Sequence, residues 1–255
     1  MLGLGASLLS PYVEGVAPYS NTKSLDCDFS ISNGVDTNYD PQSLVRASHS
    51  WSWWMKPDDG RPSSANTIFG QSNVDDANNF FRLTLGTNGA LAFYWYSNGD
   101  IALTQTTAAM FSDGAQSGFT HFVLTRDLSG TDVVHKLYKN GIEATVSILA
   151  GFNVTSANAA AYDSSGITLG IDGINSKTTP QLAGGFDGLI DEFAAFTKVL
   201  SPSEVTAIYN SGTPKDESSH DGLELYYRFE DNLTDTAGTS DGSAIGTVTF
   251  SSTTP

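Results

Sequence analysis

The sequence GGFDGLIDEFAAFTKVLSPSEVTAIYNSG, residues 184–212, joins a long strand pattern directly to one short helix. Apolar residues recur along its first part, as in a strand buried against a core, and the acidic pair Asp191 and Glu192 lies among them. A single short helix in a chain that otherwise shows strand patterns is unusual. This junction can therefore identify an architecture.

The start of the helix is strongly encoded. Ser201 is a candidate N-cap, Pro202 occupies the first helical position, and Glu204 completes a capping box. Gly212 is expected to end the helix. We therefore expect one short helix between Ser201 and Gly212.

Strand patterns recur at short intervals along the rest of the chain. They cover residues 79–85, 90–96, 120–125, 133–138, 142–149 and 167–171. A Gly-Thr-Asn-Gly loop separates the first two, which indicates a hairpin. Frequent strands of this kind favour an all-β fold with two stacked antiparallel sheets, and 255 residues suffice to build it as one domain.

The 184–212 stretch resembles the end of laminin-G-like, concanavalin A-type jelly-roll domains, whose pattern runs G-x-I-D-E-V, then L-S-x-x-E-I-x-x-L-Y-x-x-G. Further segments match the family in order and spacing: SWSWWMKP at 50–57, FTHFVLT at 119–125 and LYKNGI at 137–142. The resemblance implies a concanavalin A-like two-sheet jelly-roll sandwich with one short helix near the C-terminal end. The family is functionally broad, so the fold alone does not determine the activity.

The two ends of the chain carry distinct patterns. Residues 223–231, LELYYRFED, resemble the opening strand of the family, although here they follow the helix. We expect a permuted arrangement in which residues 223–255 supply an edge or closing strand of a domain spanning 23–255, the alternative being the start of a truncated second repeat. Residues 1–22 are expected to form an extended arm, either a disordered leader or a segment that packs along a neighbouring subunit.

Composition excludes several functions. The net charge of −16, with 12 basic residues, argues against a nucleic-acid surface and against binding to anionic membranes. No apolar run approaches the ~20 residues of a membrane span. Cys27 is the single cysteine and is expected to be a core residue. No basic residue precedes Lys23, so no secretory signal is recognised, and an extracellular or virion-surface location would be reached by another route, such as assembly into a particle.

The resemblance also implies a structural calcium ion. In the family an aspartate on the last strand often helps to hold it. Here this is Asp191, with Glu230 or Asp231 of the C-terminal strand as its partner, and Asp28 and Asp36 are further candidate ligands. Calcium takes six to eight hard oxygen ligands, which carboxylates supply. The alternative is that Asp191 only accepts hydrogen bonds within a turn.

Aromatic residues suggest a carbohydrate surface. Alternation places Trp51, Trp53 and Met55 in the core and Trp54 on the opposite face of the same strand. Sugars stack their C–H faces on rigid rings while polar groups fix their hydroxyls. A glycan groove is therefore predicted from Trp54, Arg82, Tyr94 and Tyr96, the alternative being ordinary cross-strand packing on a covered sheet face.

Catalysis is not expected. The E-x-D-x-x-E arrangement of jelly-roll glucanases does not occur, and strand alternation would place Asp191 and Glu192 on opposite faces, where they cannot flank one bond. The four histidines show no zinc-binding spacing, and His121 is expected to be a buried hydrogen-bonding residue. The predicted function is a non-catalytic module that binds glycans. The alternatives are a structural subunit of a larger assembly, such as a virion decoration or appendage protein that associates with itself or with other subunits through the arm, and a glycan hydrolase.

Overall fold

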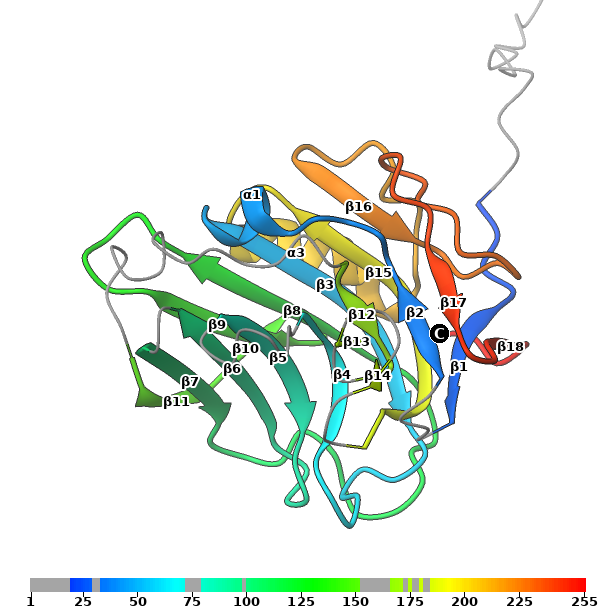
Figure 1. Ribbon diagram of the computed structural model, residues 1–255, viewed down its shortest axis with the longest axis horizontal. Helices are drawn as coiled ribbons and strands as arrows, with labels where there is room; N and C mark the ends of the chain where they lie inside the picture. The colour runs from blue at the N-terminus through cyan, green and yellow to red at the C-terminus, as the bar shows by residue number, and fades with distance from the viewer. Residues whose placement is uncertain are drawn as a thin grey trace, which may run out of the picture.

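In the computed structural model the chain forms two eight-stranded antiparallel sheets packed face to face (Figure 1). The structure describes residues 19–28, 33–71, 79–97, 100–151, 166–171, 174–175, 179–180 and 184–255. Residues 1–18 of the expected arm lie outside this set. The prediction of an all-β, two-sheet antiparallel sandwich is confirmed.

The first sheet contains the strand that precedes the main helix. Its order is β10 (Ile142–Ala144), β9 (Val134–Lys139), β8 (Thr120–Asp127), β3 (His49–Pro57), β15 (Asp187–Phe196), β1 (Ser24–Asp28) and β18 (Thr249–Ser251), while β16 (Leu223–Tyr227) also pairs with β15. β3 runs along one side of β15. β1 and β16 share the other side, because β1 pairs with residues 187–190 and β16 with residues 193–196.

The second sheet contains the predicted hairpin. Its order is β11 (Val146–Ala150), β7 (Asp100–Thr106), β6 (Leu91–Ser97), β5 (Phe80–Leu85), β4 (Asn66–Gln71), β12 (Thr168–Leu169), β2 (Gly34–Asp36) and β17 (Ser243–Ile245). A separate pair joins β13 (Ile174–Asn175) to β14 (Thr179–Pro180). The C-terminal segment therefore adds strands to both sheets.

The core lies between the sheets and follows the period-two alternation of the strands. Trp51, Trp53 and Met55 are fully buried in it, as predicted, and Cys27 is a buried free thiol of the same core. Full burial of each large apolar side chain stabilises the fold by roughly 1.5–3 kcal/mol. The inward-facing side chains of β3 thus belong to the core, so a ligand could contact this strand only through its outward-facing side chains.

Helix α3 (Pro202–Tyr209) covers part of the outer face of the first sheet. Val205 and Ile208 are buried there against Phe196 and Leu200. The capping box is confirmed: Ser201 Oγ accepts from the Glu204 N–H at 3.3 Å, and Glu204 Oε2 accepts from the Ser201 N–H at 2.8 Å. No helix among the described residues is long and apolar enough to span a membrane.

Three local features differ from the sequence expectations. The helix ends at Tyr209, with Asn210 in the left-handed conformation (φ 46°), and a 3-10 turn then runs to Gly212. A one-turn helix, α1 (Gln42–Val45), was not expected. The strand expected at 142–149 is divided, because the chain passes from the first sheet to the second at Thr145, whose carbonyl accepts from the Thr107 N–H at 3.0 Å.

Candidate functional site

Three of the four residues predicted to bind a glycan lie together on the outer face of the second sheet. Arg82 on β5 is paired with Tyr94 on β6, and Phe80 is paired with Tyr96. The residues that alternate with them are buried in the core, so these four side chains point away from it. All four are partly exposed. We call Phe80, Arg82, Tyr94 and Tyr96 the aromatic platform.

The geometry of the aromatic platform is that of stacked rings with a cation beside them. The rings of Phe80 and Tyr96 stack with centroids 4.1 Å apart and planes inclined by 21°. The guanidinium carbon of Arg82 lies 5.0 Å from the Tyr94 ring centroid and 5.8 Å from that of Phe80. Flat rings can pack against the C–H face of a sugar, and guanidinium N–H groups can donate to its hydroxyls.

Sequence reasoning missed Phe80. It lies two residues before Arg82, so strand alternation places both side chains on one face. The hairpin pairs it with Tyr96 across the strands. Both signals were present in the sequence once the hairpin had been recognised.

Trp54 does not belong to this group. It lies on β3, in the other sheet, where α3 covers it and leaves only 4% of its surface exposed. Its ring stacks on Tyr209 of α3 at 5.9 Å and lies 4.9 Å from the His121 ring. The alternative interpretation, packing on a covered sheet face, therefore holds for Trp54, and a groove that unites it with Arg82 is excluded by the fold.

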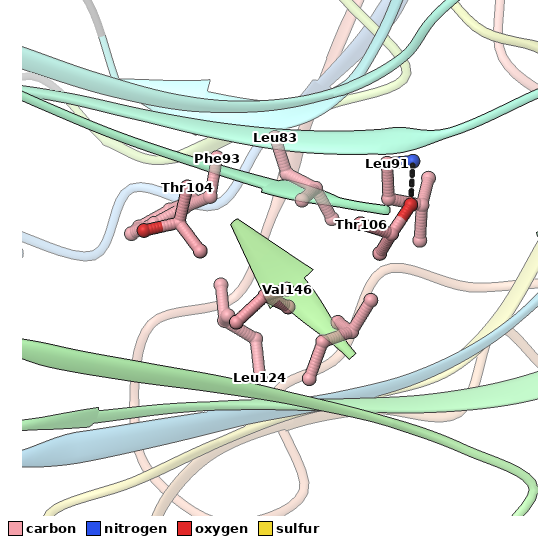
Figure 2. A pocket seen from close by; sticks show the side chains of 8 residues that line it. Leu83, Leu91, Phe93, Thr104, Thr106, Leu124 and Val146 are labelled. Carbon is pink, nitrogen blue, oxygen red and sulfur yellow. Dashed lines mark hydrogen bonds between the residues drawn. The ribbon is translucent and has the colours of Figure 1, made fainter. Parts of the chain in front are cut away.

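One cavity beneath this hairpin, between the two sheets, is too small to hold a sugar. Figure 2 shows a cavity with Val146 of β11 on one side and Leu124 beside it, opposite the hairpin residues Leu83 and Phe93. Its volume of about 10 Å³ is roughly that of one water molecule. A sugar ring cannot enter, so the exposed aromatic platform is the better candidate.

A second candidate site is a cluster of polar side chains on β15, between the part of this strand that pairs with β1 and the part that pairs with β16. Glu192 has a left-handed backbone (φ 49°), and the pairing of β15 with β3 is irregular between Asp191 and Ala194. Because of this bulge, the Asp191 and Glu192 side chains converge: the Asn21 side-chain amide donates to Asp191 Oδ2 and to Glu192 Oε1, each at 3.1 Å. The expectation that these two side chains lie on opposite faces is therefore wrong.

Burial changes the acidity of this carboxylate pair. Asp191 is 0% and Glu192 5% exposed. Burial, together with the charge of Glu192, raises the pKa of Asp191 well above its usual value. Burial also raises the pKa of Glu192 to about 7, against the opposing effect of hydrogen bonds from Tyr226 and Tyr19. Burial thus favours the protonated form of both carboxyl groups.

The surroundings of Asp191 do not fit a calcium ion. Its Oδ1 accepts from the Glu192 N–H at 2.9 Å, and its Oδ2 accepts from Asn21. Glu230 accepts from the backbone N–H of Thr22 at 2.8 Å and from its hydroxyl at 2.6 Å. Hydrogen-bond donors thus occupy the lone-pair positions of these carboxylate oxygens that a bound cation would take.

Asp28, a further predicted calcium ligand, lies elsewhere. On β1 it is paired with Asp187, whereas Asp191 lies beyond the Leu25–Ile190 pair. Within the described ranges no group of three or more acidic, histidine or cysteine side chains is placed to hold a metal ion. Calcium binding stays a prediction from the sequence.

His121 lies beneath α3, as expected of a buried hydrogen-bonding residue. Its Nε2 is 2.9 Å from the hydroxyl of Ser52, and both residues are buried. Burial lowers the pKa of His121 to about 3, so the ring is neutral. A neutral, enclosed imidazole of this kind supports packing.

Comparison with solved structures shows the same fold in several proteins. A carbohydrate-binding protein from Bacteroides ovatus, described as putative, superposes with a TM-score of 0.60 at 20% identity, covering 92% of this chain and 60% of that one. A heptameric SAP-like pentraxin from Limulus polyphemus gives 0.54 at 10% identity, covering 88% and 94%. The NanB sialidase from Streptococcus pneumoniae gives 0.51 at 21% identity, covering 76% and 28%. This chain thus spans 60% of the length of the Bacteroides ovatus chain, and at these identities the likeness concerns the fold.

No curated protein matches the sequence. The family model described as the concanavalin A-like lectin/glucanases superfamily, Laminin_G_3, matches residues 29–206, which is more than half of the chain. The matched range includes the platform hairpin and the β15–α3 junction with its capping box. The chain therefore belongs to the concanavalin A-like lectin/glucanases superfamily.

Proposed function

We propose that this chain is a non-catalytic recognition module that binds carbohydrate through the aromatic platform. The observation that carries the proposal is the stacking of Phe80 on Tyr96 beside the Arg82–Tyr94 contact, on a sheet face that is partly exposed. Rigid rings lose little conformational freedom when a ligand packs on them, so they make efficient contact surfaces. We place the protein outside a cell or on a particle surface, where glycans would be accessible to it.

The test is binding to a glycan array, followed by calorimetry on any sugar that binds. Tyr94→Ala and Tyr96→Ala should each weaken binding by about tenfold or more, because truncation of a central aromatic contact costs more than about 1.4 kcal/mol. Ile142→Ala is the matched control, since Ile142 is 74% exposed on the other sheet. Binding that survives both tyrosine substitutions, or an array without signal, would contradict the proposal.

Hydrolysis of a glycan is the alternative function that must be distinguished from binding, because the superfamily is named after both lectins and glucanases. Asp191 and Glu192 converge, but both are buried and their oxygens accept bonds from Asn21, Tyr19 and Tyr226. A glycosidase needs two carboxyl groups that flank an accessible bond. Release of reducing sugar from a glucan, lost in Glu192→Gln, would establish an enzyme instead.

A further inference from the structure

Three basic side chains lie in one row across the inner face of the first sheet. His49 on β3 is paired with Arg126 on β8, and Arg126 is paired with His135 on β9. The core residues that lie two positions from them on the same strands are Trp51, Leu124 and Leu137. Strand alternation therefore points all three basic side chains between the sheets, where they are 0%, 0% and 4% exposed. We call His49, Arg126 and His135 the histidine row.

The second sheet covers the histidine row with aromatic side chains of β6. The Arg126 guanidinium carbon lies 3.8 Å from the Trp95 ring centroid, and the centroid of the His49 ring lies 5.9 Å from that of Trp95. The His135 ring meets Phe93 edge-on, with centroids 4.9 Å apart. The histidine row and the inner side of β6 are therefore packed directly against each other.

Neither histidine has an acceptor for a second proton. The Nδ1–H of His49 donates to the Ala47 carbonyl at 2.8 Å, and Nδ1 of His135 is 2.9 Å from the Thr104 hydroxyl. The Nε2 atom of each ring is buried and has no hydrogen-bond partner. An imidazolium ion donates from both nitrogens, so protonation of either ring would bury a charged N–H group without a partner.

The neighbouring charge also opposes protonation. Burial, followed by the charge of Arg126, lowers the pKa of His49 to about 3, although the carbonyls of Ala47 and Leu44 favour the proton. Burial, followed by the charges of Arg126 and His49, holds the pKa of His135 well below its usual value. The described residues that contact the histidine row from β6 and β7 carry no charge and are Phe93, Trp95 and Thr104.

We propose that the histidine row is an acid-sensitive switch, which holds the two sheets together at neutral pH and lets them separate at this end when both imidazoles take up protons. Protonation adds two positive charges beside Arg126, and water can reach them only if β8 and β9 move away from β6. Because the pKa of each folded histidine is lowered, the stability that the neutral rings provide is present above the unfolded value of 6.5 and is lost as pH falls below it.

The switch lies directly behind the aromatic platform. Phe93 and Trp95 alternate along β6 with Tyr94 and Tyr96, so separation of the sheets removes the packing that supports the two tyrosines. Release of a glycan in acid is the consequence for ligand binding. That consequence rests on the proposed function, whereas the opening of the sheets does not.

The test is hydrogen exchange of backbone amides in the full chain at pH 7 and pH 5, corrected for the intrinsic effect of pH. Each histidine that gains a proton on opening raises the opening constant by about 25-fold between these pH values, and the two together raise it by about 600-fold. Amides of residues 124–127 and 134–137 should lose protection by this factor relative to amides of β4. His49→Gln and His135→Gln should each reduce the loss by about 25-fold, because glutamine takes up no proton.

Other titrating groups do not affect this comparison, because Glu192 and His121 are the same in every variant. His220→Gln is the matched control, since His220 is partly exposed after the main helix, and it should leave the loss of protection unchanged. Thermal unfolding at pH 7 verifies that each variant is folded, and if one histidine variant fails to fold, the other carries the test.

Three results would overturn the proposal. These are protection that wild type retains at pH 5, a loss of protection that is equal on β4, and a loss that persists undiminished in the folded histidine variants. The outcome is independent of the glycan test, because Tyr94→Ala should lose sugar binding at pH 7 while it keeps the response to acid.

Discussion

Glu192 shows how one residue can decide the chemistry of a site. Ile190 and Phe193 both point into the core, so Asp191 and Glu192 together occupy the place of a single outward residue. The left-handed backbone of Glu192 makes this possible and brings two carboxyl groups beside one amide, that of Asn21. Tyr19, Tyr226 and Asn21 then bind oxygens that would otherwise be buried without partners.

This arrangement predicts a pH-dependent stability. The pKa of Glu192, about 7 in the folded chain, lies above its unfolded value of 4.5. The folded state therefore holds the proton more tightly, and stability falls as pH rises from about 4.5 to 7, by roughly 3 kcal/mol in total. Glu192→Gln removes the ionisable group. In urea unfolding, the free energy of unfolding of this variant should exceed that of wild type at pH 8, and the difference should shrink or reverse at pH 5.

Tyr19, Asn21 and Arg228 face Glu192 from the segments beside β1 and β16, and Glu230 adds a like charge to the same region. Asn21→Ala is the companion variant, because it removes a donor without removing the titrating group. It should destabilise the chain while the pH dependence persists. An equal difference between Glu192→Gln and wild type at pH 5 and pH 8 would contradict this explanation.

At the scale of elements, sequence patterns predicted the structure correctly where it depends on residues that are close in the sequence. Alternation identified the buried tryptophans of β3, and the Ser-Pro-x-Glu signal identified the start of α3. The division of the 142–149 strand between two sheets depends on a backbone contact with Thr107, which no local pattern records. Trp54 was assigned to the wrong environment for a related reason, since alternation shows which face it occupies but does not show that α3 covers that face.

The capping box of α3 makes a prediction at this scale. Ser201→Ala removes the oxygen that accepts from the Glu204 N–H, and should lower the free energy of unfolding by about 1 kcal/mol. Since α3 is only eight residues long, loss of the cap should destabilise the whole helix and its packing on the side chains beneath it. Ser219→Ala, at an exposed turn, is the matched control. Equal unfolding midpoints for the two variants would show that the cap contributes nothing to stability.

For the whole molecule, the excess of acidic residues is the dominant electrostatic property. Asp187 lies at the start of β15, where burial and the charges of Asp58, Asp28 and Asp26 raise its pKa. The direct pairing of Asp28 with Asp187 places like charges opposite each other on adjacent strands, which is destabilising. Composition alone reveals the net charge, but it does not reveal which carboxylates the fold brings together.

Salt should therefore stabilise the chain through screening and not through a specific cation site. Sodium chloride should raise the melting temperature, and calcium chloride at matched ionic strength should raise it by the same amount. EDTA in low salt should leave it unchanged, because Asp191 and Glu230 are already occupied by hydrogen-bond donors. A rise in melting temperature that is specific to calcium at micromolar concentration, and that is lost in Asp191→Asn, would show that a calcium ion displaces these hydrogen-bond donors.

The pairing of β1 with the last strand, β18, has a topological consequence. The start of β1 and the last residues of the chain lie side by side, for Ser24 is paired with Ser251 and its hydroxyl donates to the carbonyl of Thr253 at 2.8 Å. A linker of a few residues would thus close the described chain into a ring. New ends could then be opened in the turn at residues 86–90, and every strand of both sheets would stay whole.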